Sequence, residues 1–263
     1  MKPQYFDKKA FAKYAIITIV VMLAMKYTNG IGFALVVPMF FFSLFTNKTT
    51  DAFFYLLLTV ATVMGNQFFF PKGSIYAMLN RGMLMAAGTM LVMTTIGAKG
   101  APLIRPFQGL MVYLIFIAFP SAFGWCPGIS FLKLLLFTTV YSAYVCVANK
   151  VMMSNRLEVY RVRSVVLIFA LLFVVGSLAL KPFPGISQMQ SEEYLAALTS
   201  GAHITSLFKG MTMHSQSLGP CVASIATVVL ADMVFGVRRW TKMHLAILLC
   251  APYVIYPDSV TVA

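Results

Sequence analysis

Long runs of apolar residues, separated by short polar segments, dominate this chain of 263 residues. A helix needs about 20 mostly apolar residues to cross the hydrocarbon core of a bilayer. The range 164–180 is the cleanest such run, and 52–70 and 131–149 are close to it. Apolar and polar positions do not alternate along these runs, as they would in a membrane β-barrel. The pattern therefore predicts an all-α, polytopic bundle of transmembrane helices.

We expect about nine spans that form a single transmembrane domain. The first two are short, and a turn signal at Thr28, Asn29 and Gly30 separates them. They fit either two spans or one tight re-entrant hairpin. The expected ranges are 14–28, 31–46, 52–70, 82–98, 108–124, 130–149, 164–180, 217–236 and 243–257.

Composition supports a lipid environment. Only 10% of the residues are charged, whereas an average soluble domain is roughly 25% charged. The 20 Lys and Arg residues outnumber the 7 Asp and Glu residues, which gives a formal net charge of +13. These charges lie in short loops and form no basic, aromatic-lined groove, so we expect no nucleic-acid partner. Membrane lipids are the expected surroundings.

The distribution of basic residues predicts a cytoplasmic N-terminus. With that orientation 14 of the 20 fall on the cytoplasmic side, and one, Lys133, lies just inside a span. Such an excess inside follows the positive-inside rule. Because two crossings cancel, the later loops keep their sides whether or not the first hairpin crosses twice. The five basic residues at the outer face are Lys26, Lys72, Arg81, Lys181 and Lys209.

The four cysteines show no metal-ligand spacing, and we expect neither a metal nor another cofactor. Cys146 and Cys250 fall inside expected spans. Cys126 and Cys221 both fall near the outer face, where they either form a disulfide or remain thiols.

One long polar segment, residues 181–216, faces outward in the expected topology, and within it residues 196–207 fit a short interfacial helix. Loops held by a rigid scaffold are where function concentrates. His214 lies near the end of this segment and leads through Gln216 and Ser217 into the eighth span. A histidine there can act as a general base or hold a phosphate, and the N–H groups of the following helix suit an anion. Ordinary helix capping by Ser217 is the alternative.

Three cations are candidates for binding a phosphate at the outer rim. Lys209 lies five residues before His214, Arg81 flanks an outer loop, and Lys133 lies three residues into the sixth span. Each side chain is suited to a lipid-linked diphosphate, and equally to extending its charge to the lipid headgroups.

The segment Gly210-Met-Thr-Met-His214-Ser-Gln-Ser-Leu-Gly219 resembles the Gly…His-Pro-Asn-x-Leu-Gly element of the O-antigen ligase and polymerase-like family. These membrane glycosyltransferases take glycans from an undecaprenyl-diphosphate carrier. The segment Pro127-Gly-Ile-Ser-Phe-Leu-Lys133-Leu-Leu resembles the start of a long apolar helix after an outer loop of the family. Ser-Gln stands where the family usually has Pro-Asn. Lys209 is the nearest cation where the family has arginine.

The resemblance implies transfer of an oligosaccharide from undecaprenyl diphosphate to a glycan or lipid acceptor, at the periplasmic face of a bacterial inner membrane. The chain stops at Ala263, before the family's later spans and large periplasmic loop, so we expect an N-terminal part of a longer architecture or a truncated paralogue. The implied catalytic residue is His214. The implied substrate-binding residues are Lys209, Gln216, Ser217, Lys133 and Arg81.

Two other classes of function stay open. A transporter or flippase would have buried charges in mid-span or helices broken at matched positions, and the interruptions at Gly65-Asn66-Gln67 and Pro120 are its candidates. A non-catalytic membrane subunit that docks a partner is the third possibility.

Overall fold

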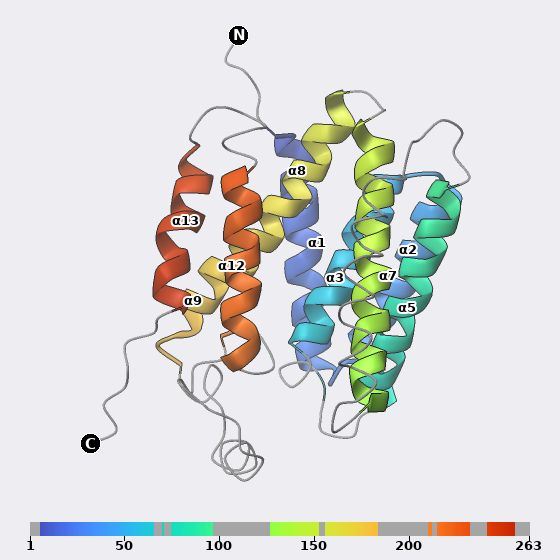
Figure 1. Ribbon diagram of the computed structural model, residues 1–263, viewed down its shortest axis with the longest axis horizontal. Helices are drawn as coiled ribbons and strands as arrows, with labels where there is room; N and C mark the ends of the chain where they lie inside the picture. Colours follow the sequence, from blue (N-terminus) through green and yellow to red (C-terminus); the bar gives the residue numbers. More distant parts are fainter. Residues whose placement is uncertain are drawn as a thin grey trace. The chain divides into compact units, whose positions relative to one another are not determined.

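The structure is a computed structural model that describes residues 6–65, 70, 75–96, 127–152, 156–183, 210–211, 215–231 and 241–255. All regular secondary structure in these residues is helical, which confirms the all-α prediction for them. The helices are α1 (Lys8–Tyr27), η1 (Ile31–Leu35), α2 (Val36–Phe45), α3 (Thr49–Met64), α5 (Ile75–Ile96), α7 (Pro127–Met152), α8 (Arg156–Leu171), η2 (Leu172–Gly176), α9 (Ser177–Leu180), α12 (Ser215–Ala231) and α13 (Lys242–Ile255) (Figure 1).

Eight of the nine expected ranges coincide with helices, and the ninth, 108–124, lies outside the described residues, as does the expected interfacial helix at 196–207. Three stretches among the described residues are long and apolar enough to cross a membrane: Lys8–Tyr27, Ile75–Thr95 and Leu157–Leu180. The third runs without a break through α8, η2 and α9. Such helices are typical of a membrane protein.

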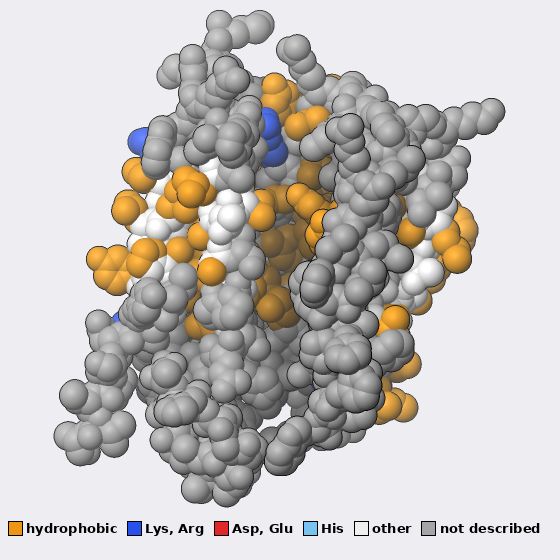
Figure 2. Space-filling view, in the orientation of Figure 1, with side chains coloured by type: hydrophobic (Ala, Val, Ile, Leu, Met, Phe, Trp, Pro, Cys, Tyr) orange, Lys and Arg blue, Asp and Glu red, His pale blue; other side chains and the backbone are white. Residues whose placement is uncertain are grey.

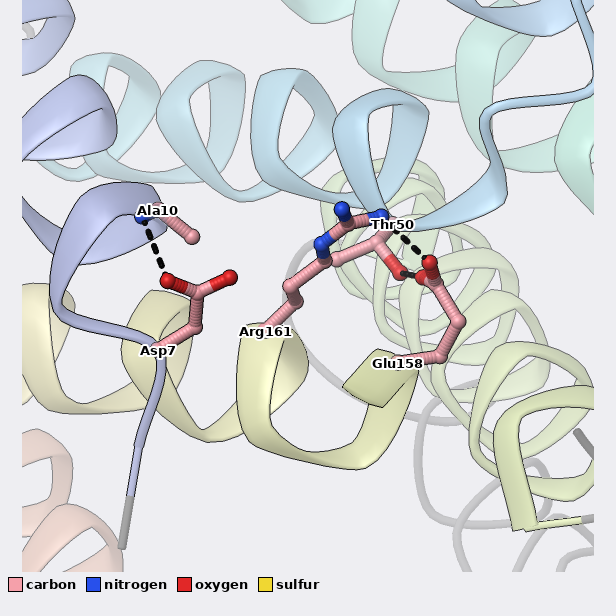
Figure 3. A network of polar contacts seen from close by, with 5 residues as sticks. All are labelled: Asp7, Ala10, Thr50, Glu158 and Arg161. Atoms are coloured by element: carbon pink, nitrogen blue, oxygen red, sulfur yellow. Dashed lines mark hydrogen bonds and ion pairs between the residues drawn. The ribbon is translucent and has the colours of Figure 1, made fainter. Parts of the chain in front are cut away.

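Three helix starts lie six or more residues earlier than hydropathy predicts, and the largest difference is at α8, which begins at Arg156. α1 begins at Lys8 because the Asp7 carboxylate caps it. Asp7 Oδ1 accepts a hydrogen bond from the backbone N–H group of Lys9 at 2.9 Å and one from that of Ala10 at 3.1 Å (Figure 3). Such a cap satisfies N–H groups that have no partner within the helix. α5 begins at Ile75, seven residues before the expected start, so the expected loop residue Arg81 lies within a helix.

The described residues belong to two compact units. The first unit takes in 1–19, 64–72 and 163–263, and the second takes in 20–63 and 73–162. α1 and α8 each contribute residues to both units.

The core of the first unit lies where the α8–η2–α9 helix, α12 and α13 pack together. α12 and α13 lie side by side (Figure 1), and α13 also contacts η2 and α9. In α13 the buried positions recur at the spacing of one helix face. The buried core residues are Leu167, Ala170, Val174, Leu218, Val222, Val229, Ile247, Ala251 and Val254.

The second unit is built around α5 and α7, which lie side by side (Figure 1). Gly88 lets them approach closely, since a Cβ atom there would lie 2.5 Å from Thr139 Cγ2. Seven residues further along both helices, Thr95 lies beside Cys146. Both contacts pair residues 51 positions apart, because 139 − 88 and 146 − 95 are equal. α5 and α7 therefore run parallel in one register.

The first hairpin is tight. Asn29 and Gly30 have φ of 52° and 93°, and a Cβ atom at Gly32 would lie 2.7 Å from the backbone of Ala24. The Thr28 hydroxyl donates to Ala24 O and accepts from the Gly32 N–H group, at 2.7 Å in each case. The apolar stretch that follows, 31–45, has fewer than 18 residues. Both interpretations of this hairpin therefore stay open.

Large apolar side chains cover the outer faces of several helices. They include Ile16 and Leu23 on α1, Met78 on α5, and Leu249 and Tyr253 on α13, each more than half exposed. Figure 2 shows hydrophobic side chains over the outer surface of α13, at the left of the view. In water such faces would be unfavourable or would mark an interface, whereas in a bilayer they contact lipid.

A polar cluster joins the starts of α3 and α8 within the second unit. The Thr50 hydroxyl donates to Glu158 Oε2 at 2.6 Å, and Arg161 Nη1 lies 2.6 Å from Glu158 Oε1 (Figure 3). In the first unit the Ser164 hydroxyl donates to the Asp7 carbonyl oxygen at 3.0 Å. These contacts lie at ends of apolar helices, where charged groups reach water or lipid headgroups.

We predict that Gly88→Ala destabilises the protein by about 1–3 kcal/mol, because the added methyl group overpacks the contact with Thr139. The measurement is thermal unfolding of the full chain in detergent. Gly82→Ala is the matched control, since a Cβ atom at Gly82 of the same helix has nothing within 4 Å. Equal losses of stability in the two variants would contradict the close packing of α5 on α7.

Candidate functional site

The structure describes four of the six predicted site residues, in part or in full. Arg81 lies in α5 and is exposed. For Lys133 in α7, and for Gln216 and Ser217 in α12, the backbone is helical and the side chains are outside the described atoms. Lys209 and His214 lie outside the described residues, but the residues next to them are described.

Gly210 and Met211, which follow Lys209, are held against Ser177 at the start of α9. The Met211 N–H group donates to Ser177 Oγ at 3.0 Å, and Ser177 is completely buried. Gly210 has φ of +52°, a left-handed conformation that favours glycine. A Cβ atom at Gly210 would lie 2.6 Å from Ser177 Oγ and 3.2 Å from Leu218 Cδ2. The backbone at 210–211 therefore has a fixed place between α9 and α12.

α12 begins at Ser215, the residue after His214, and Leu218 belongs to the core of the first unit. In the sequence, His214 therefore stands between two described and packed parts of the chain, Gly210–Met211 and α12.

The start of α12 differs from the expectation in one respect. The helix begins at Ser215, so Ser217 is its third residue. A capping residue stands just before the first helical residue, whereas Ser217 lies inside the helix; its side chain is outside the described atoms, so both interpretations of Ser217 stay open. The backbone N–H groups of residues 215–217 belong to the first turn, whose N–H groups have no carbonyl partner within the helix.

In the second unit, Arg81 and Lys133 lie level on parallel helices. Each is the seventh residue of its helix, about 9 Å along the axis from the start. The 51-residue register pairs Arg81 with position 132, next to Lys133. Arg81 also lies seven residues before Gly88, so it continues the face of α5 that packs on α7.

A buried polar pair sets the rotation of α5 just before Arg81. The Asn80 side chain is completely buried, and its Nδ2 donates to Thr62 Oγ1 of α3 at 3.0 Å. Hydrogen bonds between helices hold membrane bundles together. Because neighbouring residues on a helix point about 100° apart, burying Asn80 against α3 leaves Arg81 at the exposed edge of the α5–α7 pair.

Sequence reasoning missed Ser177 and His244. His244 is 1% exposed and lies in the first turn of α13, beside Thr241. The Thr241 hydroxyl contacts His244 Nδ1 and also accepts from the His244 N–H group at 3.4 Å. This arrangement resembles a capping box, and the spacing Thr-x-x-His before an apolar run is the signal that was available.

Cys146, Cys221 and Cys250 are free thiols, and Cys126 lies outside the described residues. Within the described part of the chain, no three His, Cys, Asp or Glu side chains gather where they would hold a metal ion.

No protein-family model, no curated protein and no solved structure matches this chain.

We predict that spin labels at Arg81→Cys and Lys133→Cys lie close together, since packed helix axes are about 8–10 Å apart. The measurement is double electron–electron resonance on the full chain with its four native cysteines replaced by alanine. The control pair, Arg81→Cys with Lys150→Cys, should be separated by about 26 Å along the axis, from 17 residues at 1.5 Å each. A shorter distance in the control pair would contradict the parallel register.

Proposed function

We propose that this protein is a membrane glycan transferase of the O-antigen ligase or polymerase type, or the amino-terminal part of one. Its donor is an oligosaccharide linked to undecaprenyl diphosphate, and its acceptor is a glycan or lipid hydroxyl. The reaction takes place at the periplasmic face of a bacterial inner membrane, where the chain is a multi-pass protein.

The observation that carries the proposal is the fixed backbone at Gly210 and Met211, four residues before the start of α12 at Ser215. The motif Gly…His followed by an apolar helix is the part of the chain that resembles the family. A catalytic residue needs a backbone held by packed neighbours. The contacts of Gly210 with Ser177 and Leu218 supply such a hold within four residues of His214.

The chemistry follows from the residue types. The hydroxyl group of the acceptor attacks the anomeric carbon of the donor sugar, and His214 accepts the hydroxyl proton. The bond between this carbon and the diphosphate oxygen breaks, and undecaprenyl diphosphate leaves. Lys209 and the N–H groups at the start of α12 stabilise the negative charge on the diphosphate. Gln216 and Ser217 donate hydrogen bonds that orient the substrate.

Arg81 and Lys133 provide a second position for anionic groups. Two cations at one level of neighbouring helices attract a phosphate more strongly than either does alone. Arg81 adds the planar fork that binds phosphate oxygens in a bidentate manner, whereas Lys133 acts as a point charge. In the proposed topology both lie at the outer ends of their helices.

The proposed topology has nine spans and a cytoplasmic N-terminus. The parallel course of α5 and α7 supports it, because the chain has to return between Ile96 and Pro127 from one end of the pair to the other. In the nine-span arrangement one span is expected between α5 and α7, at 108–124. With one crossing between them, the two helices have to run in the same direction. The clustering of basic residues on one side supports the orientation.

A transporter is the less favoured alternative. It leads us to expect charged side chains buried in mid-span. Among the described residues, the buried polar side chains are Thr, Ser, Asn and His, with no Asp, Glu, Lys or Arg. The interruptions at 66–67 and at Pro120 lie outside the described residues.

We predict that His214→Ala lowers glycan transfer by about 10²–10⁴-fold, the usual contribution of a general base. Lys209→Ala should lower it by about 10²-fold through loss of electrostatic stabilisation, and Lys209→Arg should retain most of it. The assay measures transfer from an undecaprenyl-diphosphate-linked oligosaccharide in membranes with equal amounts of each variant. His203→Ala, in the same polar segment, is the matched control. Normal transfer by both alanine variants at 209 and 214 would contradict the site.

We also predict that a cysteine at Ser187 reacts with a membrane-impermeant maleimide added to intact cells, and that a cysteine at Ser154 reacts only after the membrane is opened. We expect this difference because the loop around Ser154 is rich in basic residues, and such loops stay on the cytoplasmic side of the membrane. The reverse pattern would overturn the proposed orientation without bearing on the chemistry.

A further inference from the structure

Ser177 follows an irregular turn of the long helix in the first unit. Residues Leu172–Gly176 form a π-helical turn, and α9 continues from Ser177. A π-turn accommodates an extra residue, so it rotates everything that follows by about 100° relative to a regular α-helix. Such turns are frequent at functional sites. Here the turn sets the direction in which the Ser177 side chain leaves the helix.

The Ser177 side chain makes one contact that links distant parts of the chain. Its hydroxyl oxygen accepts the N–H group of Met211, 34 residues later, in a buried position. Gly176, the last residue of the π-turn, lies beside the same segment: a Cβ atom there would be 3.7 Å from Met211 Cγ, an ordinary packing distance. The π-turn and the serine therefore form one surface on which residues 210 and 211 rest.

Gly210 is the complementary half of this contact. Any side chain at 210 would clash with the Cβ and Oγ atoms of Ser177, which lie 2.7 and 2.6 Å from the position of its Cβ atom. The positive φ of Gly210 adds a second reason for glycine at this position. The two backbones can come this close because Gly210 has no side chain.

We propose that Ser177 is a positioning residue: its hydroxyl, presented by the π-turn, fixes the backbone of Gly210 and Met211, which stand directly after Lys209 and three residues before His214 in the sequence. The effect of Ser177 on catalysis rests on the proposed glycan transfer. Its hold on the backbone of Gly210 and Met211 is independent of that function. Ser177 touches no reacting atom in this scheme. It acts through the segment that it holds.

The direct test is hydrogen–deuterium exchange of the full chain, read from peptides that cover residues 209–214. In Ser177→Ala the Met211 amide loses its acceptor and should exchange about fivefold faster, the factor that corresponds to one hydrogen bond of typical net strength. Ser177→Thr keeps the hydroxyl acceptor and should restore the slow exchange. Unchanged exchange in Ser177→Ala would overturn the proposal, whatever the transfer assay shows.

Two matched controls separate positioning from general stability. Ser164→Ala removes another completely buried serine of the same long helix, whose hydroxyl bonds to a different segment. Gly82→Ala is the control for Gly210→Ala. Both variants add a methyl group, but at Gly82 the added group has nothing within 4 Å. Exchange at 209–214 should rise in Ser177→Ala and Gly210→Ala, and stay as in the wild type in both controls. An equal rise in the controls would show that the effect is global, which contradicts the proposal.

Glycan transfer per folded molecule gives the second measurement. If the wild type transfers glycan, Ser177→Ala and Gly210→Ala should lower kcat, while Ser177→Thr, Ser164→Ala and Gly82→Ala retain it. If the wild type shows no transfer, the proposed function fails and the exchange data still decide the role of Ser177. If exchange rises but transfer is unaffected, the role of Ser177 in catalysis is wrong.

Discussion

In a bilayer, an apolar side chain gains little by turning from lipid toward another helix, so helices are held together by close approach and by hydrogen bonds. This constraint explains which residues matter here. Gly88 meets Thr139, Gly210 meets Ser177, and Asn80 bonds to Thr62. At each place a small or polar side chain lies where a larger apolar one would keep the backbones apart. Many other large apolar residues lie on the outer faces of the helices, as Figure 2 shows for α13.

The same constraint gives the candidate site its geometry. Ser177 and Leu218 hold Gly210 and Met211, which follow Lys209 in the sequence, through a close backbone approach and one buried hydrogen bond. In the other unit, the register set at Gly88 and the rotation set at Asn80 bring Arg81 level with Lys133. Of the predicted cations, these two thus lie at the same level of neighbouring helices.

Much of the fold follows from the sequence because a membrane-spanning helix has an apolar run that can be recognised locally. Helix ends are less predictable, since the Asp7 cap, and not hydropathy, sets the start of α1. The π-turn at 172–176 and the contact of Ser177 with Met211 join parts of the chain that are far apart in sequence, and no local pattern marks them. For the site, the motif indicates His214 and Gln216, but the direction of the Arg81 side chain depends on the burial of its neighbour.

The central claim is that the segment before α12 binds a lipid-linked diphosphate donor. Photo-crosslinking tests it most directly, with an undecaprenyl-diphosphate-linked oligosaccharide that carries a photoreactive group next to the diphosphate. The full chain would be labelled in nanodiscs, and the modified peptides would be identified by mass spectrometry. We expect labelling within residues 209–217 that unlabelled donor removes. Labelling confined to the lipid-facing surfaces of α1 and α13, and unaffected by competitor, would contradict the claim.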